Sequence, residues 1–240
     1  MTRVCLLTGA GGELGDAFCR LLAADYSIVA VHHGAPPLVT TQSARLFDPL
    51  APRRTVPESQ APVFAVRADL DRPSEVDRVV ELSLARFGPV DLLVNAAADV
   101  RTSTLTTEPH LDAWQDQLLM NVVVPVHLAA ALAVACWRST EPENAERRRN
   151  VVNVTSTAGL AGPPGRGRGF YGASKAALNV LTRQMAEEYA PMGIRVNAVA
   201  PTYFPQVVPT RRVVRAVRAL DEGAMSGKVL VMDGARMRWT

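Results

Sequence analysis

Tyr171 and Lys175 stand four residues apart in a stretch that predicts a helix. At this spacing the two side chains lie one above the other on the same helical face. An ammonium beside a phenol favours the phenolate, so we expect the pKa of Tyr171 to fall below its usual ~10 by ~1–3 units. Such a phenol exchanges a proton with an alcohol or carbonyl oxygen near neutral pH. Ser156, at the end of a predicted strand, offers a hydroxyl that could hold the same oxygen; the alternative is a surface pair on an amphipathic helix.

A glycine-rich turn near the N-terminus indicates the partner of this proton chemistry. Residues 8–15 follow the first predicted strand and open the first predicted helix. Glycines allow the backbone to approach a pyrophosphate, and the free N–H groups of a helix N-terminus attract the anion. The turn therefore predicts dinucleotide binding at Gly9, Gly12, Glu13 and Leu14, although such a turn can also simply join a strand to a helix.

Two further strand ends belong to the same predicted site. Asp69 and Leu70 end the third strand, where the carboxylate of Asp69 could accept a hydrogen bond from an adenine amino group. Asn95, Ala96 and Ala97 end the fourth, and small side chains there would let a ribose lie close to the backbone. Each segment taken alone could equally be an ordinary strand terminus.

Short β-branched runs alternate with longer amphipathic stretches along the chain. The predicted strands are 3–8, 27–32, 63–67, 91–95, 151–155, 194–199 and 228–232. The predicted helices are 13–25, 73–87, 111–137, 171–190 and 209–222. Largely apolar strands are typical of a parallel sheet that helices cover on both faces. We therefore expect a single α/β domain over 1–240, with a doubly wound, seven-stranded, mostly parallel sheet.

Three segments interrupt this alternation. Residues 33–62 are rich in proline and predict a long loop, and residues 139–150 are polar and predict an exposed connection. Residues 159–169 are rich in glycine and predict a flexible loop before the helix of Tyr171. Arg166 and Arg168 in that loop could attract an anionic substrate or could simply be solvated.

The composition favours an ordinary globular protein. Apolar residues make up 48% and charged residues 20%, and the net charge of +3 is modest. Aromatic residues are only 5%, whereas nucleic-acid binders usually combine basic stripes with aromatics, so we expect no nucleic-acid partner. No apolar run approaches the ~18 residues of a membrane span, and no metal site is predicted. Three widely spaced cysteines and no signal peptide favour the cytoplasm.

Taken together, the motifs resemble those of the short-chain dehydrogenase/reductase family over nearly the whole chain. The marks are the glycine turn, Asp69, Asn95 to Ala98, Asn121, Ser156, Tyr171 with Lys175, and the run from Ile194 to Pro201. The resemblance implies a Rossmann-type fold, a nicotinamide cofactor and redox chemistry between a carbonyl and a secondary alcohol. A ketoreductase of bacterial specialised metabolism is the expected function.

The resemblance also implies a role for individual residues. Tyr171 would be the acid–base residue, and Lys175 would lower its pKa and bind the nicotinamide ribose. Ser156 would orient the substrate oxygen. Asn121 would distort its helix and hold a water behind Lys175. The cofactor would supply the hydride, while the protein supplies positioning and proton transfer.

The cofactor end departs from the family pattern at two places. The usual turn, Thr-Gly-x-x-x-Gly-x-Gly, would have glycine where this chain has Glu13, so its carboxylate either turns away or weakens binding near the pyrophosphate. The second strand ends at His32 and His33 without an acid that would select NAD through the ribose hydroxyl. We expect NADP, with NAD as the alternative. His32 or His33 could contact the 2′-phosphate, with help from Arg45, Arg53 or Arg54 in the following loop.

The substrate end departs more strongly. Pro201 and Thr202 are expected to contact the cofactor, and they stand where the family commonly has Pro-Gly. Only residues 202–226 separate Pro201 from the last predicted strand. The lid should therefore be short and the pocket open to a bulky carbonyl or alcohol substrate, or completed by a neighbouring subunit. We expect a homodimer or homotetramer through the helix of Tyr171, with Leu178, Leu181 and Met185 on its apolar face or in the core. A cofactor sensor, a pseudo-enzyme, and a non-redox dehydratase or cyclase remain alternative functions.

Overall fold

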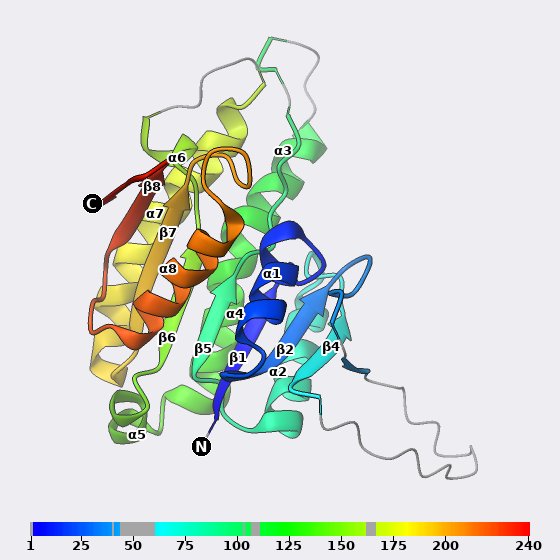
Figure 1. Cartoon of the computed structure of the whole chain (residues 1–240), viewed down its shortest axis with the longest axis vertical. Coiled ribbons are helices and arrows are strands. Elements are labelled where there is room, and N and C mark those ends of the chain that lie inside the picture. Colours follow the sequence, from blue (N-terminus) through cyan, green and yellow to red (C-terminus); the bar gives the residue numbers. More distant parts are fainter. Residues whose placement is uncertain (1, 40, 44–60, 103, 107–110, 162–166) are drawn as a thin grey trace, which may run out of the picture.

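A computed structural model describes the chain except for residues 1, 40, 44–60, 103, 107–110 and 162–166. Its described strands form one nine-stranded sheet in the order β3-β4-β2-β1-β5-β6-β7-β8-β9 (Figure 1). The strands are β1 (Arg3–Thr8), β2 (Tyr26–His32), β3 (Gln42–Ser43), β4 (Val63–Arg67), β5 (Leu92–Asn95), β6 (Asn150–Val154), β7 (Arg195–Pro201), β8 (Val229–Asp233) and β9 (Arg236–Trp239). All neighbouring strands are parallel except β8 and β9. The chain reverses its direction across the sheet between β1 and β5, and open α/β sheets bind ligands at such a point.

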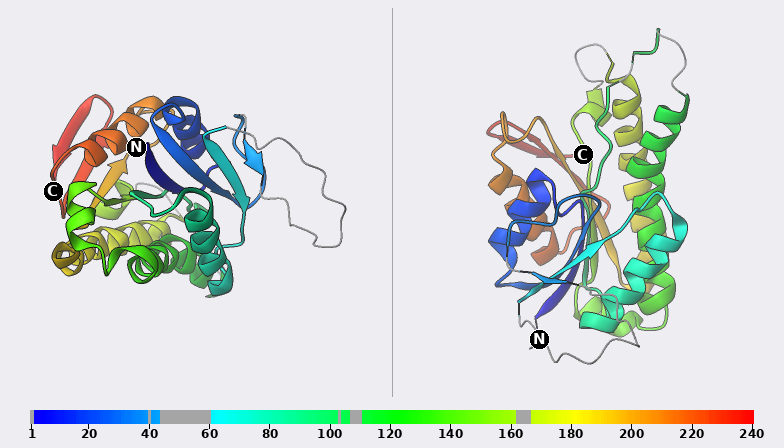
Figure 2. Two further views of the ribbon diagram at one scale, coloured as in Figure 1. Left: turned by 90° about the horizontal axis from the view of Figure 1, so that it is seen from below. Right: turned by 90° about the vertical axis from the view of Figure 1, so that its right-hand side faces the viewer.

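Helices cover both faces of this sheet (Figure 2). They are α1 (Glu13–Leu22), α2 (Pro73–Phe87), α3 (Leu111–Leu118), η1 (Leu119–Val123), α4 (Val124–Leu132), η2 (Ala133–Trp137), α5 (Glu141–Glu146), α6 (Ala158–Ala161), α7 (Gly169–Tyr189), η3 (Ala190–Met192) and α8 (Thr210–Glu222). Helices α1 and α8 pack together on one face, while α2, α4 and α7 lie on the other. A separate apolar cluster fills each layer. The expected doubly wound architecture is confirmed.

The seven-strand prediction omitted two edge strands. All seven predicted strands are present, and β3 and β9 extend the sheet at its two ends. β3 contains only two residues, within the proline-rich segment 33–62 that we expected to be a loop; most of that segment lies outside the described residues. β9 has four exposed residues, so it lacks the apolar run that marked the other strands.

The predicted helix 111–137 is one helical run with two π segments, η1 and η2. Its part Asp112–Trp137 is long and apolar enough to cross a membrane by length and composition. The same test is passed by core helices, and Leu128, Leu132 and Trp137 are fully buried in the layer between this run and the sheet. Packing against the sheet thus accounts for the apolar sequence.

Residues 139–150 were expected to form an exposed connection, and most of them are exposed, but part of the segment turns inward. They contain the short helix α5, and the side chains of Asn144 and Arg149 are fully buried. Arg149 pairs with Glu143 at 2.6 Å and lies 3.5 Å from Asp91, which is itself fully buried and also pairs with Arg147. Buried charges need such partners, so an ion-pair network accounts for the charged side chains of this segment that face inward.

Candidate active site

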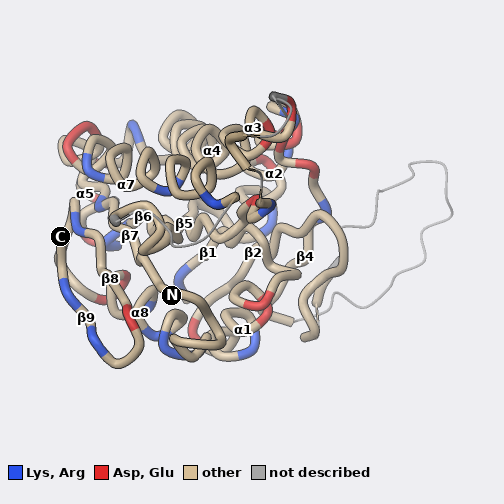
Figure 3. Tube along the Cα trace, turned by 90° about the horizontal axis from the view of Figure 1, so that it is seen from above, with Lys and Arg blue, Asp and Glu red and all other residues tan. Residues whose placement is uncertain are grey.

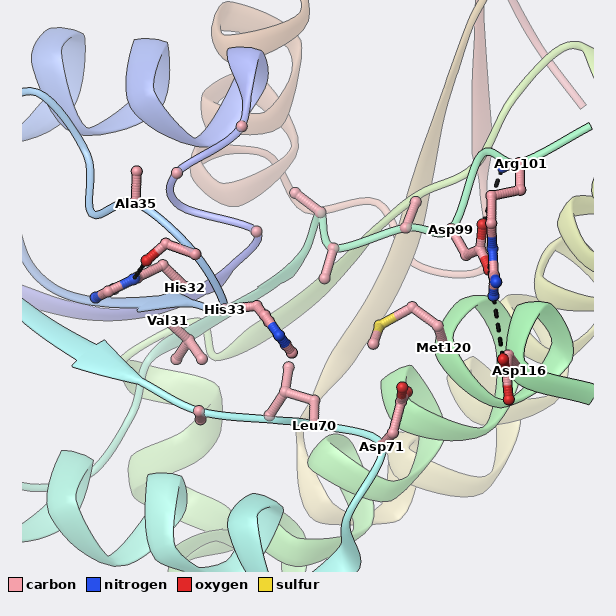
Figure 4. A pocket seen from close by; sticks show the side chains of 18 residues that line it. Val31, His32, His33, Ala35, Leu70, Asp71, Asp99, Arg101, Asp116 and Met120 are labelled. Atoms are coloured by element: carbon pink, nitrogen blue, oxygen red, sulfur yellow. Dashed lines mark hydrogen bonds and ion pairs between the residues drawn. The ribbon is translucent and has the colours of Figure 1, made fainter. Parts of the chain in front are cut away.

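The carboxyl ends of β1, β2, β4 and β5 surround a cleft of about 480 Å³ (Figure 4). Its walls are the glycine turn, the end of β2, the segment after β4 and the segment after β5. The lining residues are Gly9, Gly11, Gly12, Val31, His32, His33, Gly34, Ala35, Ala68, Leu70, Asp71, Ala96, Ala97, Ala98, Asp99, Arg101, Asp116 and Met120. Among the predicted cofactor residues, Gly9, Gly12, His32, Leu70, Ala96 and Ala97 therefore meet at one cavity.

The glycine turn is built to bring backbone close to backbone. Gly9 has φ of +70°, and a Cβ there would lie 2.8 Å from the Ala97 nitrogen. A Cβ on Gly11 would lie 2.0 Å from the Ala35 carbonyl oxygen, and one on Gly15 would lie 2.3 Å from the Gly9 oxygen. Only glycine fits these contacts without movement. The cradle that a dinucleotide pyrophosphate requires is thus present, which supports the expected cofactor class.

The Thr8 hydroxyl connects this turn to the segment after β5. Its oxygen accepts hydrogen bonds from the backbone N–H groups of Ala96 at 3.1 Å and Ala97 at 3.0 Å. Asn95 was expected to contact the cofactor, but it does not line the cleft. Its side chain is buried and donates to the Asn153 carboxamide oxygen at 2.8 Å. Leu14 likewise packs into the core, so only its backbone can serve a cofactor. Thr8 precedes the glycine motif directly, but nothing in the sequence indicated this bridge.

The structure answers the question raised by Glu13. Its carboxylate accepts a 2.8 Å hydrogen bond from the hydroxyl of Thr210, the first residue of α8. The side chain therefore turns toward α8, and Glu13 is not among the residues that line the cleft. The first of the two alternatives given for Glu13 is confirmed.

The end of β2 supplies two histidines, His32 and His33, to one end of the cleft. His32 Nδ1 lies 2.8 Å from the Gly34 carbonyl oxygen, and His33 Nδ1 lies 3.9 Å from the Asp69 carboxylate. Asp69 also pairs with Arg72 at 3.3 Å and lies outside the cleft lining, so its expected contact with adenine competes with this ion pair. Arg45, Arg53 and Arg54 lie outside the described residues.

Sequence reasoning missed a charged cluster at the other end of the cleft. Arg101 pairs with Asp99 at 2.5 Å and with Asp116 at 3.3 Å (Figure 4). Burial raises the pKa of Asp99, but the hydrogen bonds from Arg101 outweigh it and leave the pKa below its usual value. Asp99 directly follows the Asn95–Ala98 motif, and that position was the available signal.

Tyr171 and Lys175 share a face of α7, as their spacing predicted. The Lys175 nitrogen lies 5.8 Å from the centre of the Tyr171 ring. Lys175 is buried and donates to the Val154 carbonyl oxygen at 2.9 Å, and burial lowers its pKa to about 8. Burial raises the pKa of Tyr171, while a hydrogen bond with Ser156 and the charge of Arg168 oppose this rise. The prediction that the phenol pKa falls is therefore wrong, because burial outweighs the Ser156 hydrogen bond and the charge of Arg168.

Asn121 joins the cleft to the catalytic helix. It lies in the π segment η1, which agrees with the expected distortion, and its side chain is fully buried. Its carboxamide accepts from the Asp99 N–H and donates to the Asp99 carbonyl, both at 2.8 Å. It also donates to the Ser174 hydroxyl at 3.0 Å, next to Lys175. Asn121 therefore joins the cleft wall at Asp99 to α7, the helix that carries Tyr171 and Lys175, although neither of these two residues lines the cleft.

Ser156 stands between the ends of β6 and β7. Its hydroxyl accepts from the Ala158 N–H at 3.1 Å and lies 3.5 Å from the Pro201 carbonyl oxygen. Pro201 is buried as the last residue of β7, and the Thr202 hydroxyl bonds to the Met232 carbonyl and the Asp233 carboxylate. The helix predicted over 209–222 is α8, which packs on α1, so only residues 202–209 remain as a lid.

A glycine cradle at the switch point of a parallel sheet, with Ser, Tyr and Lys beside it, defines a dinucleotide-binding oxidoreductase of the Rossmann class. The sequence matches the short chain dehydrogenase family over residues 3–213. The chain belongs to that family.

Known relatives extend this comparison. A 3-oxoacyl-(acyl-carrier-protein) reductase from Synechocystis is 30% identical over 202 residues, which cover 84% of this chain and 74% of that protein. A short chain dehydrogenase from Mycobacterium avium superposes with a TM-score of 0.79 at 22% identity, covering 100% of this chain and 84% of the other. The RhlG/NADP active-site complex of Pseudomonas aeruginosa superposes with a TM-score of 0.76 at 21% identity, covering 97% of this chain and 95% of the other. These two structures support the fold.

Proposed function

We propose that the protein is an NADP(H)-dependent reductase that transfers hydride between the nicotinamide and a ketone or secondary alcohol. The observation that carries this proposal is the Asn121 bridge between the cleft and the helix of Tyr171 and Lys175. It brings a general acid and a dinucleotide cradle together, which a cofactor sensor does not need. The 3-oxoacyl reductase from Synechocystis supports a ketone as substrate.

Each predicted catalytic residue has a defined task in this proposal. Tyr171 donates the proton to the substrate oxygen when a ketone is reduced, and its raised pKa keeps the phenol protonated at neutral pH. Ser156 holds the same oxygen from β6. Lys175, fixed by the Val154 carbonyl, would bind ribose hydroxyls, and Asn121 keeps the helix in place. The nicotinamide supplies the hydride when it is bound.

The charges around the end of β2 support NADP over NAD. No carboxylate ends β2, and the exposed Arg67 donates to the His33 carbonyl at 3.1 Å. A guanidinium and two imidazoles at this edge suit a 2′-phosphate better than a ribose hydroxyl. The NADP complex of RhlG agrees with this choice. The Glu13 carboxylate, held by Thr210, leaves the pyrophosphate cradle free of an opposing charge.

The short segment after β7 supports a bulky substrate, because eight residues cannot cover the site as a two-helix lid would. A ketoreductase step of bacterial specialised metabolism fits such a substrate. A non-redox dehydratase or cyclase gains no specific support from the geometry.

We propose that the chain acts as one domain over 1–240 in the cytoplasm, without a nucleic-acid or membrane partner. In Figure 3, basic and acidic residues are interspersed along the trace.

We propose a homodimer or homotetramer formed through the outer face of the α4–α7 layer. Leu178 and Met185 do not contribute to this face, because both are buried in the core. The exposed apolar residues there are Val123, Val134 and Val180, which are 51%, 69% and 63% exposed. α7 packs against η1, so Val123 and Val180 belong to adjacent helical segments.

The first test is reduction of a panel of ketones by NADPH, followed by loss of the NADPH absorbance. Tyr171→Phe should lower kcat by about 10²–10⁴-fold, because the general acid is lost. The dissociation constant for NADPH should change little, since the cradle is untouched. NADPH binding without turnover of any ketone by the wild type would indicate a sensor instead. Full activity in Tyr171→Phe would refute the assigned role.

A further inference from the structure

Arg168 and Tyr203 form a pair beside the catalytic tyrosine. The guanidinium carbon of Arg168 lies 4.7 Å from the centre of the Tyr203 ring. Arg168 directly precedes α7, and Tyr203 is the second residue after β7, so the pair joins the segments on either side of the site. The Arg168 carbonyl accepts from the Gly172 N–H at 2.9 Å, which fixes its backbone three residues before Tyr171.

The stacked guanidinium has no anionic partner within the part of the chain that the structure describes. Other arginines near the site do, since Arg101 pairs with Asp99 and Arg72 pairs with Asp69. Arg168 is half-buried, and none of its N–H groups takes part in a hydrogen bond among the described residues. A cation over an aromatic ring is attracted by the ring face and needs no N–H hydrogen bond for that contact, so the donors of the guanidinium stay available for a planar, bidentate acceptor. A carboxylate is such an acceptor.

The Arg168 charge lies near the phenol of Tyr171. The Lys175 ammonium is directed at the Val154 carbonyl inside the protein. Arg168, in contrast, acts on the Tyr171 phenol closely enough to oppose the rise of its pKa. An anion bound by Arg168 would therefore lie near the oxygen that Tyr171 protonates. On the side of α3, the stacked rings of Trp114 and Phe170, 4.7 Å apart, form an apolar surface next to it.

We propose that Arg168, held over the Tyr203 ring, binds the carboxylate of the substrate, so that the protein prefers oxo acids over neutral ketones. This inference rests on the proposed function, because it assigns a substrate class to the same site. The carboxylate and the ketone must be only a few bonds apart, since one end meets Arg168 and the other meets Tyr171. Arg166, which precedes it, lies outside the described residues and has no part in the proposal.

Oxo acids and their methyl esters provide the kinetic test, because the ester keeps the ketone and removes the charge. 3-Oxobutanoate, 4-oxopentanoate and 5-oxohexanoate, each with its ester, vary the distance. The wild type should favour at least one acid over its ester by about tenfold or more in kcat/KM, the usual worth of a charged hydrogen bond. Arg168→Gln should remove that preference, mainly through KM, and Arg168→Lys should keep part of it.

A matched control separates a local site from net charge. Arg215 is an exposed arginine on α8, remote from Tyr171, so Arg215→Gln makes the same change of charge. It should leave the ratio of acid to ester unchanged. Equal rates for every acid and its ester in the wild type would overturn the proposal. Equal losses for acid and ester in Arg168→Gln would do the same.

A binding measurement keeps this inference separate from the proposed function. Tyr171→Phe, loaded with NADPH, is titrated calorimetrically with the same oxo acids, with and without Arg168→Gln. Thermal unfolding of each variant checks that it is folded. Binding that depends on Arg168 supports the carboxylate site even if no ketone is reduced, and the redox function alone then fails. Ketone reduction by the wild type, combined with acid binding independent of Arg168, refutes the carboxylate site alone.

Discussion

Lys175 illustrates how burial changes the chemistry of a single residue. Its ammonium has one hydrogen-bond acceptor in the described structure, the Val154 carbonyl, and is otherwise enclosed. Desolvation disfavours the charged form and lowers the pKa from 10.5 to about 8. At neutral pH the folded protein therefore carries a buried cation at an energetic cost, which a cofactor ribose would offset with hydroxyl acceptors.

The sign of the resulting pH effect follows from this shift. Below pH 8 Lys175 is protonated in both states, so the whole cost opposes folding. Between pH 8 and 10.5 the unfolded chain binds more protons than the folded protein, and stability rises with pH. Compared with Lys175→Met, the wild type should gain about 3 kcal/mol in the free energy of unfolding across this window. Urea unfolding of both proteins at pH 8 and pH 10.5 measures this gain. A difference in unfolding free energy between wild type and Lys175→Met that stays constant with pH would contradict the lowered pKa of Lys175.

At the scale of elements, the turn between β1 and α1 depends on close approach of the loop after β2. A Cβ on Gly11 would lie 2.0 Å from the Ala35 carbonyl oxygen, whereas one on Gly34 would meet no atom within 4 Å. Gly11→Ala should therefore cost about 1–3 kcal/mol and weaken NADPH binding, because the loop must move. Gly34→Ala is the matched control and should be neutral or slightly stabilising. Thermal unfolding with and without NADPH compares them, and equal melting temperatures would refute the contact.

The contact between α1 and α8 controls where a carboxylate points. The Thr210 hydroxyl holds the Glu13 carboxylate away from the cleft. Thr210→Val should release it toward the pyrophosphate and weaken NADPH binding by about threefold to tenfold, the range of a screened charge interaction. Adding Glu13→Gln to Thr210→Val should restore the affinity, since the charge is removed. Fluorescence titration with NADPH measures both, and an unchanged affinity in Thr210→Val would count against this role.

Particular elements show what the sequence could and could not predict. The strands and the glycine turn were predictable, because apolar runs and glycine spacing reflect local constraints. Asn121, Ser156 and Lys175 were indicated by the family motif, and their catalytic roles stay predictions. The direction of the pKa shift of Tyr171 was not predicted correctly, because it depends on how deeply α7 buries the phenol. The Arg101 and Arg168 contacts join segments far apart in sequence, so their residue types alone could not indicate them.

At the scale of the whole molecule, the proposed oligomer uses the outer face of the α4–α7 layer. Val180→Glu would place a charge on an exposed apolar position of α7, so it should dissociate an oligomer formed there without disturbing the core. Light scattering after size-exclusion chromatography would then report a lower mass than for the wild type. Val207→Glu, exposed on a different segment, is the matched control. A mass that Val180→Glu leaves unchanged would exclude this face.

The last strand leaves one edge of the sheet open to other molecules. Among the described strands β9 pairs with β8 alone, and Val229 and Thr240 exchange both backbone hydrogen bonds at its end. Because pairing alternates along an antiparallel ladder, Met237 and Trp239 direct their amides outward from the sheet. Arg236 and Arg238 put positive charge on alternate residues of this edge strand. Two copies meeting there would face each other with like charges, so we expect the hairpin to disfavour edge-to-edge association of this chain.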